Sequence, residues 1–272
     1  MTLEIADASG HTVRKLSSLG DPDEVQGDEE GDEGPRGPVT PKLPAKAGLN
    51  RFAWDLRAAP AKRFKGLVLW GGGLQGPEVV AGHYSVRLVA AGVTRVESLE
   101  VRRDPRLTTS EADDRARYDL LIAIRDKLTK THEAIVRIRE VRDQVRAAAE
   151  RAKASAADTS VTRSAERLVH RLTAVEEALY QTKNRSSQDP LNFPIRLNNK
   201  LSLLGGTVAG TEGRPTDQQQ MVLHDLARRI DDQLATFEAV TGPELTAFNR
   251  LMHERDVPAV VARGAKEPMS GP

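Results

Sequence analysis

Residues 189–216, DPLNFPIRLNNKLSLLGGTVAGTEGRPT, carry the pattern that decides how the second half of the chain folds. Behind Pro194, which a first helical turn tolerates, apolar residues recur at helical spacing: Leu197, Leu201, Leu204 and Val208. Asn198 and Asn199 lie inside this helix and residues 205–206 are glycines, although both residue types weaken helix interiors. Two interpretations stay open: an irregular connector, or a helix held by tertiary packing whose amides bond to a neighbouring segment.

The composition bounds the class of protein. A chain of 272 residues is long enough for one or two domains, and with only 4% aromatic residues we expect two modest aliphatic cores. The net charge of +1 provides no field that would attract nucleic acid, so no nucleic-acid partner is expected. The absence of cysteine excludes disulfides, a thiolate nucleophile and cysteine-ligated zinc, and leaves the compartment open.

The N-terminal sequence MTLEIADASG has neither the basic region nor the apolar region of a signal peptide. No apolar run approaches the roughly 20 residues that cross a bilayer. We therefore expect no membrane span and no export signal in the chain as written.

Residues 1–104 alternate between apolar and polar positions with the period of a β-strand. The apolar sets are Leu3 and Ile5, then Phe52, Trp54 and Leu56, then Tyr84, Val86 and Leu88, then Leu99 and Val101. Turn signals at residues 7–10, 47–50 and 90–92 separate these runs. The pattern predicts a small antiparallel β-sandwich.

Residues 20–44 interrupt this domain. Eight acidic residues between Asp21 and Glu33 are followed by four prolines, and such a composition predicts a disordered, solvated loop. Calcium binding is the alternative, but DEEGDE lacks the alternating ligand spacing of an EF-hand loop.

After residue 104 the apolar period becomes helical. One seam joins Tyr118, Leu121, Ile124, Leu128, Thr131, Ile135, Ile138, Val141, Val145, Ala148 and Ala152 in a single long helix. A second seam runs from Val161 to Leu179, a third helix covers residues 189–208, and a fourth runs from Thr216 to Val240 and resumes at Leu245 after an interruption at Gly242-Pro243. We expect an antiparallel, coiled-coil-like four-helix bundle over residues 105–256 and a flexible tail over 257–272. Ser110 with Asp113, and Thr216 with Gln219, resemble capping boxes.

A search for catalytic chemistry finds no convincing set. His132-Glu133 begins like a zinc-protease motif, but Val136 stands where the second histidine belongs, so His132 is expected on exposed helix surface, as are His170 and His224. The glycines at 71–73 lack the Lys-Ser/Thr pair of a phosphate loop and predict a turn. We expect no catalytic, metal-binding or cofactor-binding residues.

Two tryptophans are candidate contact residues. Trp54 alternates with apolar neighbours and is expected in the core, with stacking on a sugar as the alternative. Trp70 ends the run LVLW, which is either a buried strand or an exposed contact with a sugar or adjoining domain. The arginines of the long helix suggest nucleic-acid binding, but 11 basic and 9 acidic residues between Glu111 and Lys153 instead favour a solvated, ion-paired face.

Several segments resemble a known family: LEIADASGHTVRKL, LPAKAGLNRFAWDLR, LVLWGG, GHYSVRLVAAGVTRVESLEVRRDPR, LNFPIRLNNKLSLLGGTVAGTEGRPT and LTAFNRLMHERDVPAV. They are similar to the C-terminal region of bacterial exported proteins labelled glycosyl hydrolases, whose N-terminal part is a sortilin-like, Asp-box β-propeller. The strand half also resembles the Ig-like domain of the flagellar hook-capping protein through Gly48, Asn50, Phe52, Trp54, Asp55, Gly82 and Tyr84. The resemblance implies an Ig-like fold and export.

Asp-box motifs and propeller blades are absent from this sequence, so any glycosidase chemistry of the family belongs to the propeller. We therefore expect a non-catalytic accessory module that docks to a β-propeller or a protein partner, with Trp54, Trp70, Asn198, Asn199 and Lys200 as candidate interface or packing residues. The alternatives are a glycoside hydrolase, which needs two placed carboxylates, and a carbohydrate-binding module that uses Trp70.

Overall fold

The computed structural model describes residues 1–20, 41–154, 159–255 and Val260. Of the segment 20–44, expected as a disordered loop, residues 21–40 lie outside the described residues, whereas Leu43 is buried and its main-chain N–H donates to the Ser17 carbonyl at 3.1 Å. The expected flexible tail, residues 257–272, also lies outside the described residues apart from Val260.

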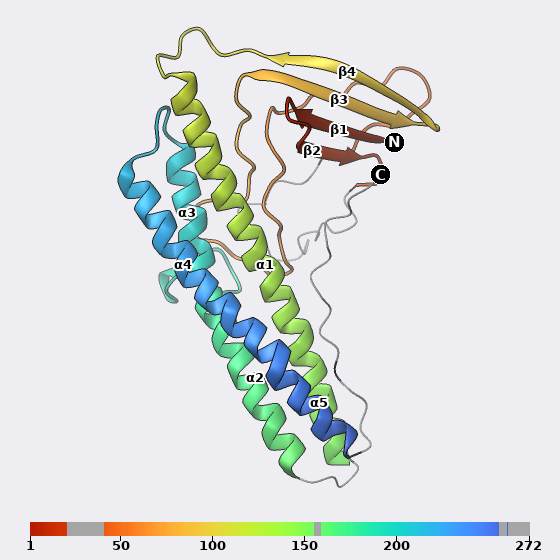
Figure 1. The fold of residues 1–272 in the computed structure, drawn as a ribbon, viewed down its shortest axis with the longest axis vertical. Coiled ribbons are helices and arrows are strands. Elements are labelled where there is room, and N and C mark those ends of the chain that lie inside the picture. The colour runs from red at the N-terminus through yellow and green to blue at the C-terminus, as the bar shows by residue number, and fades with distance from the viewer. Residues whose placement is uncertain (21–40, 155–158, 256–259, 261–272) are drawn as a thin grey trace.

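The fold is of the mixed α+β class, with one antiparallel sheet and a group of helices (Figure 1). The strands are β1 (Thr2–Asp7), β2 (Thr12–Ser17), β3 (Gly82–Ala90) and β4 (Val93–Val101), in the order β2-β1-β3-β4. Hairpins join β1 to β2 and β3 to β4, as the turn signals predict. Ala91 and Gly92 both have positive φ angles, 49° and 77°, which suits the tight two-residue turn between β3 and β4.

The strand expected over residues 52–56 does not form. Leu56 has a φ of 55°, and the carboxylate of Asp55 accepts the main-chain N–H of Arg57 at 3.1 Å, so the chain turns where a strand would extend. Among the described residues the strands belong to this single sheet, so the second layer of the expected sandwich is not seen.

In the described ranges the sheet is followed by the α-helices α1 (Glu111–Ala154), α2 (Thr159–Leu179), α3 (Leu197–Ala209), α4 (Asp217–Ala239) and α5 (Leu245–His253). The expected capping boxes are confirmed, because Ser110 and Asp113 exchange hydrogen bonds, as do Thr216 and Gln219. Figure 1 shows α1, α2 and α4 running side by side beneath the sheet.

Two helix boundaries differ from the expectation. The third helix begins at Leu197, because residues before it form only a 3₁₀ turn, η1 (Asp189–Leu191), and a non-helical link through Pro194. Gly242-Pro243 does not interrupt the last helix, since a π-helical segment, η2 (Val240–Glu244), carries α4 into α5. A wider π turn accommodates a proline ring that has no N–H to donate.

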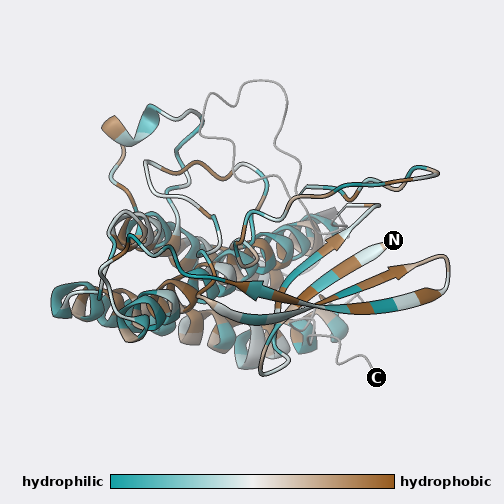
Figure 2. Ribbon diagram, turned by 90° about the horizontal axis from the view of Figure 1, so that it is seen from above, coloured by the Kyte–Doolittle hydropathy of each residue, from teal (hydrophilic) through white to brown (hydrophobic). Residues whose placement is uncertain are grey.

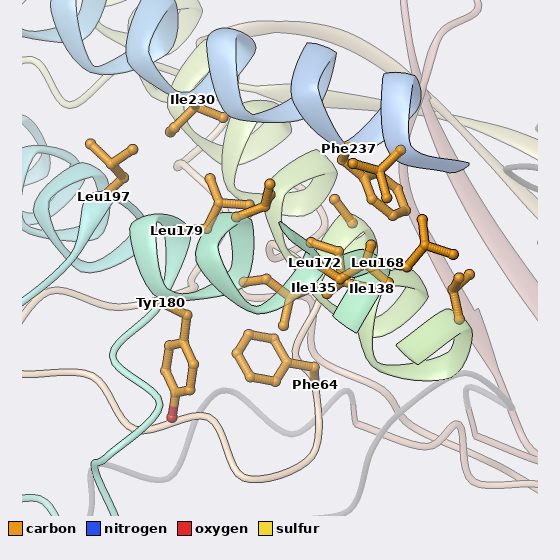
Figure 3. Close-up of a cluster of buried hydrophobic side chains, with 14 of the residues drawn as sticks. Phe64, Ile135, Ile138, Leu168, Leu172, Leu179, Tyr180, Leu197, Ile230 and Phe237 are labelled. Carbon is orange, nitrogen blue, oxygen red and sulfur yellow. The ribbon is translucent and has the colours of Figure 1, made fainter. Parts of the chain in front are cut away.

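The larger core lies among the helices. From Ile124 to Ala152 the seam of α1 is buried, and it belongs to one apolar cluster with residues of all the other α-helices. Residues 58–76, which we call the strap, add Ala61, Phe64, Leu67 and Leu74 to this core although they precede β3 in sequence. Figure 3 shows Phe64 beside Tyr180, with their ring centroids 5.0 Å apart.

A smaller core lies against the sheet, formed by Ile5, Val13, Ala58 and Tyr84. The end of the β3–β4 hairpin reaches away from the helices (Figure 2), and most of β4 is exposed. Within the described ranges, no helix has both the length and the apolarity to cross a bilayer.

Replacing Phe64 with Ala is expected to lower the free energy of unfolding by about 3 to 5 kcal/mol, because a fully buried aromatic ring is removed from the helical core. Urea unfolding followed by circular dichroism measures the change. Leu49→Ala is the control, since Leu49 is 100% exposed and its truncation should cost less than about 0.5 kcal/mol. Equal, small effects of both substitutions would show that the strap does not belong to the core.

Candidate functional site

The side chain of Asn199 holds the strap against α3. Its Oδ1 accepts the main-chain N–H of Trp70 at 2.7 Å, and its Nδ2 donates to the Trp70 carbonyl at 3.0 Å. An amide that bonds both main-chain groups of one residue replaces the pairing that a neighbouring strand would supply. Of the two interpretations of residues 189–216, the structure therefore agrees with a helix whose Asn side chains bond to a neighbouring segment.

The next contact between α3 and the strap requires glycine. The Ser202 hydroxyl donates to the Gly73 carbonyl at 3.1 Å, and a Cβ on Gly72 would lie 2.4 Å from Ser202 Oγ and 2.6 Å from its carbonyl carbon. Gly206 of α3 is also close to Gly72, because a Cβ on Gly206 would lie 3.5 Å from the Gly72 Cα. The glycines at 71–73 therefore permit close backbone packing onto α3.

His132 of α1 is buried, with 1% of its surface exposed, so the expectation of an exposed surface histidine is wrong for this residue, although His170 and His224 are exposed. Its Nδ1 lies 2.6 Å from the Lys62 carbonyl of the strap, and its Nε2 lies 3.4 Å from Asn198 Nδ2. Because a carbonyl only accepts, Nδ1 carries the proton and Nε2 is the acceptor for Asn198. Burial lowers the pKa of His132 to about 4, which keeps the ring neutral near pH 7.

The remaining candidate residues from the sequence do not meet at one point. Trp54 is half-buried against the smaller core, where it packs edge-on to Tyr84 with centroids 5.9 Å apart and donates its indole N–H to the Arg57 carbonyl. Trp70 has its main chain fixed by Asn199 while 38% of its surface stays exposed. Lys200 is exposed on α3.

A cavity of about 750 Å³ lies at the junction of the sheet, the strap, α1 and α3. Its apolar lining includes Leu74, Ile124 and Leu128, and its polar lining is rich in arginine and carboxylate. An apolar surface with a few fixed polar groups is the usual composition of a ligand-binding pocket. We call it the junction cavity.

The carboxylates of the junction cavity are bonded to neighbouring groups. Glu78 pairs with Arg57 at 2.6 Å, and Asp114 pairs with Arg103 at 2.9 Å. Hydrogen bonds from Arg106 lower the pKa of Asp104, whereas a general acid needs a raised pKa. Over the described part of the chain, no three His, Cys, Asp or Glu side chains gather in a group that could hold a metal ion.

A second cavity, of about 480 Å³, lies between α1, α2 and the loop that follows α2. The arginines of α1 were expected on a solvated, ion-paired helix face. Arg139 and Arg142 are ion-paired, but their partner is the carboxylate of Glu176 on α2, which is 2% exposed. The spacing of Arg139, Arg142 and Arg146 puts them on one face of α1, and this pattern in the sequence could have indicated an arginine cluster. We call this the arginine cavity.

Comparison with known proteins gives no match to a family model, to a curated protein or to a solved structure. The assignment of function therefore depends on the geometry described above and on the resemblance of the sequence segments.

Replacing Asn199 with Ala is expected to lower the free energy of unfolding by about 2 kcal/mol, because the main-chain N–H and C=O of Trp70 lose their partners. Urea denaturation measures the loss, and the tryptophan emission spectrum should shift in the folded state. The control is Lys200→Ala, a change at the adjacent exposed position that should leave both quantities unaltered. A stability equal to that of the unsubstituted chain would contradict the role of Asn199.

Because of His132, the free energy of unfolding should decrease as the pH is lowered. Its pKa is lowered on folding, so between about pH 6.5 and 4 the unfolded state binds a proton that the folded state does not. The stabilisation is complete above about pH 6.5 and decreases by about 3 kcal/mol as the pH falls to 4.

Urea unfolding at a series of pH values measures this slope. His132→Gln should flatten it, whereas His170→Gln, at an exposed position, should not. If the two variants have the same slope, another group causes the pH dependence.

Proposed function

We propose that the chain is a non-catalytic interaction module that docks to a protein partner through the β3–β4 hairpin. The observation that carries the proposal is the exposure of β4, an edge strand of nine residues in which only Leu99 and Val101 are even half-buried. Long exposed edge strands invite pairing with another chain, and recognition domains use such edges for strand addition.

The hairpin also presents apolar side chains. Val93 and Val96 are 55% and 59% exposed, and their neighbours across the hairpin, Ala90 and Arg87, leave them uncovered. Because alternate residues point to opposite faces, Val93 and Val96 place one apolar contact on each side of the sheet. A partner strand that pairs with β4 would cover both.

The partner that we favour is a sortilin-like, Asp-box β-propeller, from the resemblance of the sequence segments. A propeller consists of antiparallel blades with short edges, and one such edge is suited to continue the sheet beyond β4. We further propose that the helices are an antiparallel four-helix bundle and that the sheet is the remainder of an Ig-like fold. The shared apolar core of the helices and the two antiparallel hairpins support these finer assignments.

Glycan binding is the second candidate function. Trp70, which is 38% exposed and whose main chain is fixed by Asn199, is suited to stack on a sugar. Loss of glycan-array binding in a folded Trp70→Ala variant would favour this function over protein docking.

Glycoside hydrolysis is less well supported, because the carboxylates of the junction cavity are bonded to arginines or main-chain groups. Release of sugars from a panel of glycans incubated with the purified chain would support glycoside hydrolysis.

The docking proposal is tested with the purified chain and a purified Asp-box β-propeller domain encoded in the same genome. Isothermal titration calorimetry should detect binding, and the double substitution Val93→Lys with Val96→Lys should weaken it by about tenfold or more, since two charges would be placed against the partner. Met221→Lys is the control, because Met221 is 70% exposed on α4, away from the hairpin.

Binding that survives the double substitution, or that Met221→Lys weakens equally, would show that β4 is not the docking strand. Absence of binding by the unsubstituted chain would remove the propeller as the partner.

A further inference from the structure

We propose that the arginine cavity binds a tetrahedral oxyanion, namely the phosphate or sulfate group of a small ligand. The cavity is lined by four arginines, Arg139, Arg142 and Arg146 from α1 and Arg185 from the loop after α2, and by one carboxylate, Glu176. Four guanidinium groups and one carboxylate give the lining a formal charge of +3.

Glu176 accounts for only part of this charge. Its Oε1 accepts from Arg139 Nε at 2.6 Å and its Oε2 accepts from Arg142 Nη1, so both carboxylate oxygens are occupied. A buried carboxylate needs a positive partner, and these two contacts supply it. Arg146 and Arg185 are not needed for that purpose, and they add like charges to the same cavity.

Arg146 and Arg185 keep charge at the cavity that nearby carboxylates neutralise only in part. Arg146 Nη1 lies 3.8 Å from the carboxylate of Asp143 on the exposed helix surface, where such pairs are weak. Arg185 Nη1 donates to the carbonyls of Thr182 and Asn184, which position the guanidinium without cancelling its charge. Asp189 accepts the main-chain N–H groups of Arg185 and Ser186 through Oδ2. These hydrogen bonds, and to a smaller extent the Arg185 charge, lower the pKa of this carboxyl, so Asp189 offsets part of that charge.

A donor inside the cluster also lacks an acceptor. The Nε–H of Arg142 is buried and has no hydrogen-bond partner among the described residues, and only 14% of this side chain is exposed. A buried donor without a partner is unfavourable, and an oxyanion in the cavity adds acceptor oxygens next to this side chain.

The geometry favours a phosphate or sulfate group over a carboxylate. Guanidinium groups bind such groups through paired, charge-assisted hydrogen bonds, and a phosphate monoester, which carries nearly two negative charges at pH 7, gains more from a lining of charge +3 than a singly charged sulfate ester does. The volume of about 480 Å³ is far larger than the roughly 30 Å³ share of one water molecule, so the cavity accommodates the group together with part of its carrier. This inference does not depend on docking by β4, because the cavity and the hairpin involve different residues.

The test is calorimetric titration of the purified chain, in phosphate-free buffer of low ionic strength, with inorganic phosphate, inorganic sulfate, glucose 6-phosphate and glucose. We expect saturable binding of at least one of the anions and none of neutral glucose. Arg146→Gln and Arg185→Gln should each weaken anion binding by about tenfold, which is the usual effect of losing a charged hydrogen bond. Both residues are exposed, so these variants should fold normally.

Arg167→Gln is the matched control, since Arg167 is an exposed arginine of α2 outside the cavity lining, and its loss should leave the affinity unchanged. Glu176→Gln should strengthen binding, because it removes the carboxylate that competes with the anion for Arg139 and Arg142. Binding of glucose 6-phosphate alone, or of the inorganic ions as well, supports the proposal and distinguishes a carried group from a free ion.

The proposal is overturned if none of the anions binds, if glucose binds as tightly as glucose 6-phosphate, or if Arg167→Gln weakens binding as much as the cavity variants do.

Discussion

The structure depends on how the main chain of the strap is satisfied. Residues 58–76 cross the helices without pairing as a strand, yet buried polar groups must find partners. Side chains supply them: Thr129, His132 and Arg139 of α1, Tyr180 after α2, and Asn199 and Ser202 of α3 all bond to strap main-chain groups. These side chains thus take the place of the groups that a neighbouring strand would supply.

The same contacts join the sheet to the helices. The main-chain N–H of Ala59 donates to the Val13 carbonyl of β2, and its carbonyl accepts from Arg125 of α1. Gly76 lets the end of the strap lie directly against its beginning, because a Cβ at this position would be 2.0 Å from the Ala58 carbonyl oxygen. Both cavities border the strap, the junction cavity through residues such as Leu67 and Leu74 and the arginine cavity through Gly66.

Local patterns predicted much of the fold, and long-range contacts account for what they missed. The helical seam of α1, its capping box and the β3–β4 turn depend on residues close in sequence, and the structure confirms them. The burial of His132 depends on Lys62, 70 residues away, and the sequence period of α1 does not contain that information. Asn199 was singled out because its helical cost required a partner, but nothing local identified Trp70 as that partner. The arginines around Glu176 looked solvated for the same reason, since their shared carboxylate lies on another helix.

The central claim is that the strap makes the sheet and the helices one cooperative unit. In a Trp70→Phe background Trp54 is the remaining tryptophan and reports on the smaller core against the sheet, while far-ultraviolet circular dichroism reports mainly on the helices. Urea unfolding followed by both signals tests the claim directly. The account predicts coincident transitions with one midpoint. A sheet signal that is lost at a clearly lower urea concentration than the helical signal would contradict it and would show two independently stable parts.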